Sequence, residues 1–264
     1  MSIAKPRERV LITDIQEVNK YFTVPANVRD ISSWNRVKIR SLIFTSLASA
    51  SLLGFGTFIK ESDYSRKSVK TVNRFKLPLN FSYIDSGWFQ DWELAKVLEQ
   101  NGVGLKPDIE DIAEEWIKKN GLENKKFNFC HIRRTDYANH LGGITLPLTY
   151  YQDALARLMK YDDGTPLLIT GDDYDFAKLA FKDLPRATIF SEPPGLTLAI
   201  LQRATNGIIS NSTFGWWAGY LASKNGGSIY APKYFMGWKL RENIPAALVY
   251  PGFKWLDVLA EPDK

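Results

Sequence analysis

The chain has 264 residues, of which 45% are hydrophobic and 24% charged, as in an ordinary globular protein of one large or two small domains. Its single cysteine, Cys130, excludes an internal disulfide, and one cysteine with two histidines is too few for a structural zinc site. Its 34 Lys and Arg against 29 Asp and Glu give a charge of +5 that is spread along the chain, which argues against nucleic-acid binding and fits an anionic small-molecule substrate or a membrane-surface partner.

The N-terminal part of the chain is weakly patterned. Its first residues, MSIAKPRERVLITD, are charged from the fifth position on, so we expect no secretory signal. Residues 41–59 are uncharged and long enough to span a membrane, but eight of these nineteen residues are Ser, Thr or Gly. We therefore expect a buried helix here, or a helix lying on a membrane surface.

Individual strands and helices can be recognised from residue 81 on, and they alternate regularly from residue 125 on. A short strand and a helix ending at Gly102 come first, and then an amphipathic helix at 108–121 with its acids early and its lysines late. Apolar strands are predicted at 126–132, 166–170, 187–192, 208–210 and 228–232, with helices at 149–161, 171–184, 196–207 and 212–227. This alternation predicts an α/β fold with a parallel sheet covered on both faces.

Three of these strands end on polar residues, at the edge of a parallel sheet where ligands gather. The first carries Arg133 and Arg134, whose planar guanidinium groups suit phosphate. Because neighbours on a strand face opposite ways, we expect one arginine to bind a ligand and the other to pair internally, with Asp136 as its candidate partner. Structural ion pairs for both arginines are the alternative.

The second strand ends on a pair of carboxylates, and the third strand ends on a candidate anion site. Asn211 or Ser212 can cap the helix that follows the third strand, and its first amides, with the hydroxyls of Ser212 and Thr213, would bind an anion. An ordinary cap above buried aromatic residues is the alternative. Asp172 and Asp173 can bind a ribose or guanine edge, cap the next helix, or bind a divalent metal, for which no third ligand is near.

Taken together, the three strand ends predict a nucleotide-sugar site. A pyrophosphate would be held by an arginine on one strand and a helix N-terminus on another, with carboxylates reaching the nucleoside. The chain has neither a GxxxxGK[ST] nor a GxGxxG motif, which argues against a P-loop kinase and a dehydrogenase.

Several stretches resemble the donor-site motifs of glycosyltransferase family 11, the α-1,2-fucosyltransferases that use GDP-fucose. They are HIRRTDY from His131, the Asp172-Asp173 pair, and above all GLTLAILQRATNGIISNSTFGWWAGYL from Gly195. The stretch IDSGWFQDWEL from Ile84 is similar to that family's Gly-Tyr-Phe-Gln segment. The resemblance spans residues 81–238, and its Ser-Asn-Ser-Thr-Phe-Gly-Trp-Trp run is highly specific.

The resemblance implies a GT-B-like architecture of two Rossmann-like halves with parallel sheets. We expect an acceptor-side half at 1–122 and a GDP-sugar-binding half at 123–264. The N-terminal half is expected to be incomplete, because nothing matches the family's Gly-Gly-Leu-Gly-Asn-Gln-type loop and RERVLITDIQEV resembles the segment that follows it.

The resemblance also implies roles for individual residues. Arg133 would hold the donor β-phosphate and stabilise the leaving GDP, Asp136 would orient the arginine pair, and Asp85 is the candidate catalytic base. His131 is expected to be packed rather than catalytic. The implied donor-binding set comprises Arg133, Arg134, Asp172, Asp173, Asn211, Ser212, Thr213 and Phe214, with no metal ligand and with GDP-fucose as a substrate rather than a cofactor.

The predicted function is therefore inverting, metal-independent transfer of L-fucose from GDP-fucose to the 2-hydroxyl of a galactose in a bacterial surface glycan such as lipopolysaccharide. The expected partners are GDP-fucose and a galactose-containing acceptor, with no nucleic acid. The expected location is cytoplasmic and peripheral at the inner membrane. Two alternatives stay open: transfer from a different nucleotide sugar, and a non-catalytic GDP-sugar-binding remnant.

Overall fold

The computed structural model describes residues 102–160, 164–184 and 186–259 together with residues 20–23 and a helix at 92–100. Five short N-terminal strands are described by their backbone. The chain divides into two compact units, one of residues 1–104 with 246–248, and one of residues 105–245 with 249–264. The two units are described separately.

The first unit holds two small sheets and a helix. β1 (Val10–Ile12) pairs in parallel with β2 (Val28–Asp30). β3 (Gly56–Lys60) is antiparallel to β4 (Lys70–Val72) and parallel to β5 (Phe81–Ile84), and α3 (Trp92–Gln100) follows. This unit also contains the short 3-10 helix η4 (Ala246–Leu248).

The prediction of a helix over residues 41–59 is wrong for the last four residues. Residues 56–59 belong to strand β3, where Phe58 pairs with Tyr83 of β5 and Ile59 with Ile84. Aromatic and β-branched residues such as these favour strands over helices. Residues 41–55 lie outside the described residues. Among the helices that the structure describes, none has the length and apolar character needed to cross a membrane.

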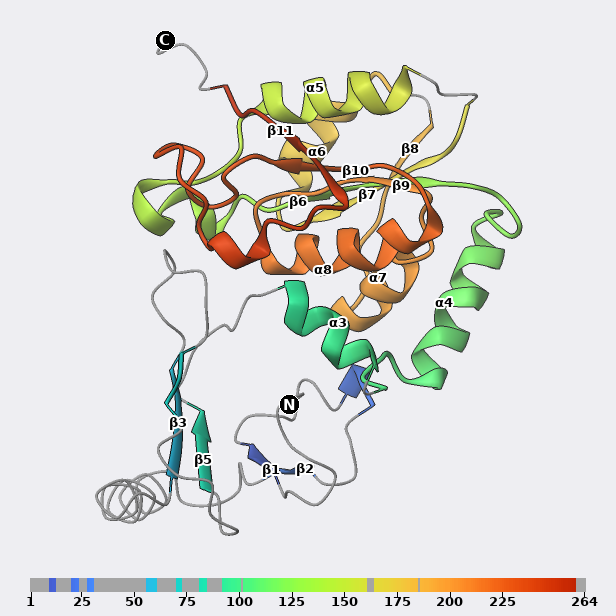
Figure 1. Ribbon diagram of the computed structural model, residues 1–264. Coiled ribbons are helices and arrows are strands. Elements are labelled where there is room, and N and C mark those ends of the chain that lie inside the picture. The colour runs from blue at the N-terminus through green and yellow to red at the C-terminus, as the bar shows by residue number, and fades with distance from the viewer. Residues whose placement is uncertain are drawn as a thin grey trace. The chain divides into compact units, whose positions relative to one another are not determined.

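A six-stranded, all-parallel sheet forms the centre of the second unit (Figure 1), which confirms the α/β class and the parallel sheet. The strand order is β11-β10-β9-β6-β7-β8, and each neighbouring pair is parallel. The strands are β6 (Asn128–Ile132), β7 (Leu167–Gly171), β8 (Ala187–Ile189), β9 (Asn206–Ile208), β10 (Ile229–Pro232) and β11 (Phe253–Leu256).

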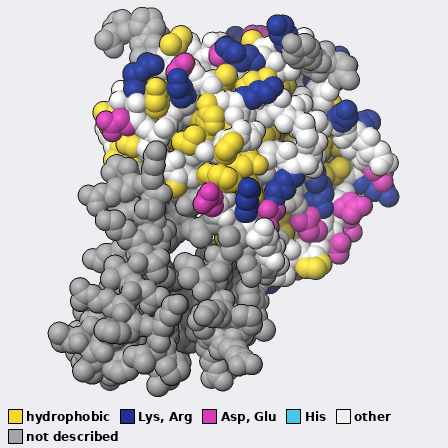
Figure 2. Space-filling model, in the orientation of Figure 1, with side chains coloured by type: hydrophobic (Ala, Val, Ile, Leu, Met, Phe, Trp, Pro, Cys, Tyr) yellow, Lys and Arg dark blue, Asp and Glu magenta, His cyan; other side chains and the backbone are white. Residues whose placement is uncertain are grey.

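Helices cover both faces of this sheet, with α5 and α6 on one side and α7 and α8 on the other (Figure 1). The helices are α4 (Pro107–Lys119), α5 (Leu148–Met159), α6 (Tyr174–Phe181), α7 (Pro194–Leu201) and α8 (Thr213–Ala222), with the 3-10 helices η1 (Asp136–Ala138), η2 (His140–Gly142) and η3 (Ser223–Asn225). Charged side chains of both signs are interspersed on the described face shown in Figure 2.

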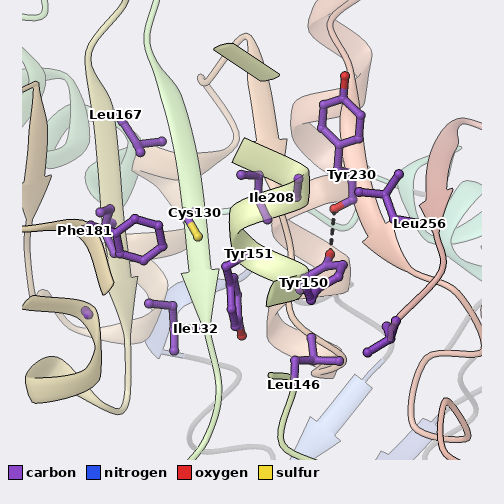
Figure 3. Close-up of a cluster of buried hydrophobic side chains, with 14 of the residues drawn as sticks. Cys130, Ile132, Leu146, Tyr150, Tyr151, Leu167, Phe181, Ile208, Tyr230 and Leu256 are labelled. Atoms are coloured by element: carbon purple, nitrogen blue, oxygen red, sulfur yellow. Dashed lines mark hydrogen bonds between the residues drawn. The ribbon is translucent and has the colours of Figure 1, made fainter. Parts of the chain in front are cut away.

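The alternation of side chains along β6 decides which groups reach which face. Cys130 and Ile132 enter the hydrophobic core beneath α5 and α6, beside Tyr150 and Tyr151 (Figure 3). His131, one residue away, contacts the ring of Phe214 in α8 on the opposite face. All five residues of β6 are buried, so Cys130 is a packed core residue of this strand.

Several element boundaries differ from those expected from the sequence. α7 ends at Leu201, and β9 begins at Asn206. The side-chain amide of Asn206 donates to the side-chain carbonyl of Asn128 at 2.9 Å and connects β9 to β6. β11 was not predicted at all. The second unit includes α4, which packs against α7, and Gln202, just after α7, donates to Glu110 at 2.6 Å.

The strand order contains a topological switch point between β6 and β9. From β6 the chain passes to β7 and β8 on one side, and then returns to β9, β10 and β11 on the other. The β6–β9 pairing ends at Cys130 and Ile208, whereas the β6–β7 pairing continues to Ile132 and Gly171. In open parallel sheets, ligands bind outside the carboxyl ends of strands at such a point.

Candidate active site

Arg133 lies at the carboxyl end of β6 with its guanidinium oriented by two carboxylates. Nη2 donates to Asp136 Oδ2 at 2.8 Å, and Nε lies 3.3 Å from Asp172 Oδ2. The hydrogen bond to Asp136 is the main cause that raises the pKa of Arg133 above its ordinary value. These two contacts use two of the five N–H groups of a guanidinium, and the side chain is 39% exposed. Arg133 is therefore a fixed, accessible cation.

Arg134 turns to the opposite face of the sheet and is engaged within the unit. Nε pairs with Asp173 at 3.2 Å, Nη1 donates to the Leu146 carbonyl at 2.9 Å, and the guanidinium carbon lies 3.8 Å from the centre of the Phe176 ring. The internal partner of Arg134 is thus Asp173. Asp136, the partner expected for one of the two arginines, pairs with Arg133. Asp136 follows on η1, on the same side as Arg133.

Asp172 holds the turn that carries Arg133. Its carboxylate accepts hydrogen bonds from the backbone N–H groups of Arg134 at 2.8 Å and Thr135 at 3.2 Å, and from the Thr135 hydroxyl at 2.6 Å. The contacts of Asp172 therefore go to the β6 loop, and its contact with guanosine stays a prediction.

Asp173 caps α6, which is one of the roles considered for the pair. Its Oδ1 accepts from the Phe176 amide at 2.9 Å, and its Oδ2 carries the ion pair with Arg134. An N-cap carboxylate satisfies one of the unpaired amides at a helix start and opposes the positive end of the helix dipole. Contact of Asp173 with guanosine also stays a prediction.

Across the switch point from Arg133, the chain runs from β9 directly into α8. Ser212 is the N-cap residue, and its hydroxyl oxygen accepts from the Gly215 amide at 3.0 Å. Thr213 begins the helix and is partly exposed. The N-terminal end of a helix carries partial positive charge and free amides, so this end suits an anion.

A buried hydrogen-bond chain connects the two sides of the switch point. His131 Nδ1 lies 2.9 Å from the Ser210 hydroxyl, and Ser210 donates to the Ser212 hydroxyl at 3.3 Å. With its proton on Nδ1, His131 donates to Ser210, and the chain ends on the N-cap oxygen. Ser210 is the first residue of the Ser-Asn-Ser-Thr-Phe-Gly-Trp-Trp run, but no role in the site was predicted for it.

Burial keeps His131 neutral. Desolvation lowers its pKa to about 4, Asp172 opposes this shift and Arg133 adds to it. A Cβ atom placed on Gly215 would come within 2.9 Å of Nδ1, so α8 approaches the imidazole closely enough to require glycine. His131 is packed into the wall of the site, as expected.

Asn211, Asp136 and Phe214 are the remaining predicted site residues that the structure describes. Asn211 is fully buried; its Nδ2 donates to the Ile144 carbonyl at 2.8 Å, and its Oδ1 has no hydrogen-bond partner in the described part of the chain. The hydrogen bond from Arg133 lowers the pKa of Asp136. Phe214 is half-buried beside His131, with ring centres 5.2 Å apart.

Asp85, the candidate base, lies outside the described residues. Within the described ranges, no group of three or more His, Cys, Asp or Glu side chains is placed to hold a metal ion.

Comparison with known proteins places these features in a family. The family model described as Glycosyl transferase family 11 matches residues 37–236. A curated relative, the O-antigen biosynthesis glycosyltransferase WbnK of Escherichia coli, is 26% identical over 199 residues. The match covers 69% of this chain and 66% of the relative, so the chain spans just under two thirds of that protein's length.

Solved structures show a looser likeness. POFUT1 in complex with GDP has a TM-score of 0.39 at 18% identity, covering 52% of this chain and 49% of that one. The fucosyltransferase NodZ from Bradyrhizobium has a TM-score of 0.42 at 12% identity, covering 76% and 74%.

Proposed function

The chain belongs to glycosyl transferase family 11, and we propose that it transfers L-fucose from GDP-fucose to the 2-hydroxyl of a galactose in a bacterial surface glycan, with inversion. The curated relative is named for O-antigen biosynthesis, which supports a glycan of the lipopolysaccharide type. The observation that carries the proposal is that Arg133 lies on one side of the β6–β9 switch point and the N-terminus of α8 on the other.

This pair of groups suits a nucleoside diphosphate leaving group. When the bond to the sugar breaks, negative charge develops on the β-phosphate, and a preorganised cation with free N–H groups stabilises it. Arg133 is held in place by Asp136 and Asp172 and keeps three N–H groups beyond those contacts. Removing one such donor from an enzyme site typically raises the barrier by about 2.7–4 kcal/mol.

The N-terminus of α8 supplies the second half of the proposed pyrophosphate site. The Ser212 oxygen accepts the Gly215 amide, which leaves its own proton to donate to a phosphate oxygen. Thr213 and the first-turn amides add further donors at the positive end of the helix dipole. With these groups in place, we propose that the donor binds without a metal, so that chelation with EDTA leaves turnover unchanged.

The acceptor hydroxyl must lose its proton during transfer, which requires a general base. We propose Asp85 for this role. Replacing Asp85 with Asn should reduce kcat by about 10²–10⁴-fold while GDP affinity is retained, because a base acts on the acceptor rather than on the nucleotide. Retained kcat in that variant would exclude Asp85 as the base.

We further propose that the reaction takes place on the cytoplasmic side of the inner membrane, with the protein bound peripherally. The mild positive charge of the chain is compatible with an anionic membrane surface. Cell fractionation at low and high salt tests this, because a peripheral electrostatic contact is released by salt. Recovery in the soluble fraction at low salt would contradict membrane binding.

The donor is tested by titrating the purified chain with GDP, GDP-fucose and UDP, followed by turnover assays with β-galactosides. The proposal predicts binding of GDP and GDP-fucose, no binding of UDP, and release of GDP on addition of a galactoside. Binding of UDP in place of GDP would indicate another nucleotide sugar. Binding of GDP-fucose without turnover on any galactoside would indicate a non-catalytic sugar-nucleotide-binding protein.

A further inference from the structure

The chain leaves the paired part of the sheet at Ile209, one residue after the last ladder pair of β6 and β9. The Ile209 amide still donates to the Tyr230 carbonyl at 3.0 Å. Its own carbonyl accepts from the hydroxyl of Tyr150 at 2.7 Å. Tyr150 is a buried residue of α5 whose hydroxyl also lies 3.4 Å from the Tyr230 carbonyl, as Figure 3 shows. Just beyond the last β6–β9 pair, the chain is therefore held by a hydrogen bond from the Tyr150 side chain of α5.

A second hydrogen bond ties the same loop to the chain segment that enters α5. Asn211 Nδ2 donates to the Ile144 carbonyl at 2.8 Å, and the Trp238 indole donates to the same oxygen at 3.1 Å. Ile144, Asn211 and Trp238 are all buried. The loop between β9 and α8 is thus held at residues 209 and 211 by a segment that starts at Ile144 and ends at Tyr150.

This segment also contacts the loop after β6. Arg134 Nη1 donates to the Leu146 carbonyl at 2.9 Å, and the Ile144 amide donates to the Tyr137 carbonyl at 2.9 Å. The two sides of the switch point lose their direct ladder contact after Cys130 and Ile208. Residues 144–150, which we call the brace, contact both sides beyond that point.

We propose that the brace sets the separation between Arg133 and the first turn of α8, and that Tyr150 and Asn211 are positioning residues for the donor site. The role of the site in binding a donor rests on the proposed function. The mechanical role of the brace does not depend on it.

Substitution of Tyr150 with Phe removes one hydroxyl and leaves the buried Ile209 carbonyl without its donor. Buried carbonyls are almost always hydrogen-bonded, so the loop must shift or open to find a new partner. Loss of a buried hydrogen bond of this kind should weaken GDP binding on the order of tenfold. Misplacement of reacting groups by about 1 Å can lower kcat by a further 10²-fold.

The matched control is Ser223→Ala. The Ser223 hydroxyl donates to the Tyr220 carbonyl at 2.7 Å, at the opposite end of α8 from the loop between β9 and α8. This variant loses a hydroxyl-to-carbonyl hydrogen bond of the same length at the C-terminal end of α8, without touching the brace. In Ser223→Ala, the amide exchange of the loop between β9 and α8 and the affinity for GDP should both be the same as in the parent.

The test is amide hydrogen exchange of peptides covering residues 205–217, measured in the parent, Tyr150→Phe and Ser223→Ala without ligand. We expect exchange in Tyr150→Phe to be accelerated on the order of tenfold over these residues while a β7 peptide is unchanged, and Ser223→Ala to match the parent there. Parent-like exchange in Tyr150→Phe, or equal acceleration across the whole sheet, would overturn the proposal.

GDP titration of the same proteins separates this inference from the proposed function. If the parent does not bind GDP, the proposed function fails, and the exchange rates alone still decide whether the brace holds the loop. If the parent binds GDP and Tyr150→Phe binds it equally well, the positioning role is wrong. Should Tyr150→Phe fail to fold, Asn211→Ala replaces it, because it removes the second hydrogen bond between the loop and the brace, the one to the Ile144 carbonyl, and should also accelerate exchange at 205–217.

Discussion

Replacing His131 with Gln tests whether the buried end of β6 carries a neutral imidazole. Burial lowers the pKa of His131 in the folded protein to about 4, against 6.5 for an exposed histidine. Between these values the unfolded chain binds a proton here that the folded chain does not, so stability falls as the pH drops from 6.5 towards 4. Glutamine is polar but has no side chain that titrates in this range.

The size of the effect follows from the two pKa values. Each unit of difference corresponds to about 1.4 kcal/mol, so His131 should lower the free energy of unfolding by about 2.5 kcal/mol between pH 7.5 and pH 4.5. Carboxylates also titrate in this range, but they do so in both proteins. The difference between the parent and His131→Gln therefore isolates the histidine.

The assay is urea unfolding of both proteins at pH 7.5 and pH 4.5. The parent should lose about 2.5 kcal/mol more than His131→Gln over this interval. If the free energy of unfolding falls by the same amount in both proteins, the imidazole is protonated in the folded state at pH 4.5. That result would contradict a neutral imidazole in the hydrogen-bond chain to Ser210 and Ser212.

Three further substitutions and one control variant test the neighbouring contacts by urea unfolding. Gly215→Ala should cost about 1–3 kcal/mol, because the new methyl group would press on the imidazole, whereas Gly104→Ala, with open space around it, should cost less than about 0.5 kcal/mol. Ser212→Ala should cost about 0.5–2 kcal/mol through loss of the α8 cap, and no loss would exclude it as the cap. Asp172→Asn should cost about 1.5–3 kcal/mol because the carboxylate accepts two backbone amides and the Thr135 hydroxyl; an unchanged value would contradict its role in holding the β6 loop.

The sheet was predictable because each of its strands from β6 to β10 is a short apolar run followed by polar residues. The alternation along β6 also placed Arg133 and Arg134 on opposite faces before any contact was known. β11 was not predicted because Phe253–Leu256 mixes two buried residues with an exposed lysine, and the element before it is the short 3-10 helix η4 rather than an α-helix. A four-residue edge strand of this kind gives little periodic signal.

The partners of the site carboxylates could not be read from the sequence. Asp172 bonds to amides 37 and 38 residues away, a distance that only the packing of β7 beside β6 brings together. In the same way, Tyr150 looks like an ordinary core residue of an amphipathic helix. Its contact with Ile209 exists only because β9 lies on the far side of β6 in the strand order.

The most direct test of the donor site is a calorimetric titration with GDP of the parent, Arg133→Ala and Arg157→Ala. Arg157 forms an exposed ion pair with Asp153 within α5 and serves as the charge-matched control. We predict that Arg133→Ala raises the Kd for GDP by about 10- to 150-fold, as expected for loss of a charged hydrogen bond, while Arg157→Ala leaves it unchanged. Equal Kd values for all three proteins would show that Arg133 serves only its two carboxylates, and would contradict a donor site at the β6–β9 switch point.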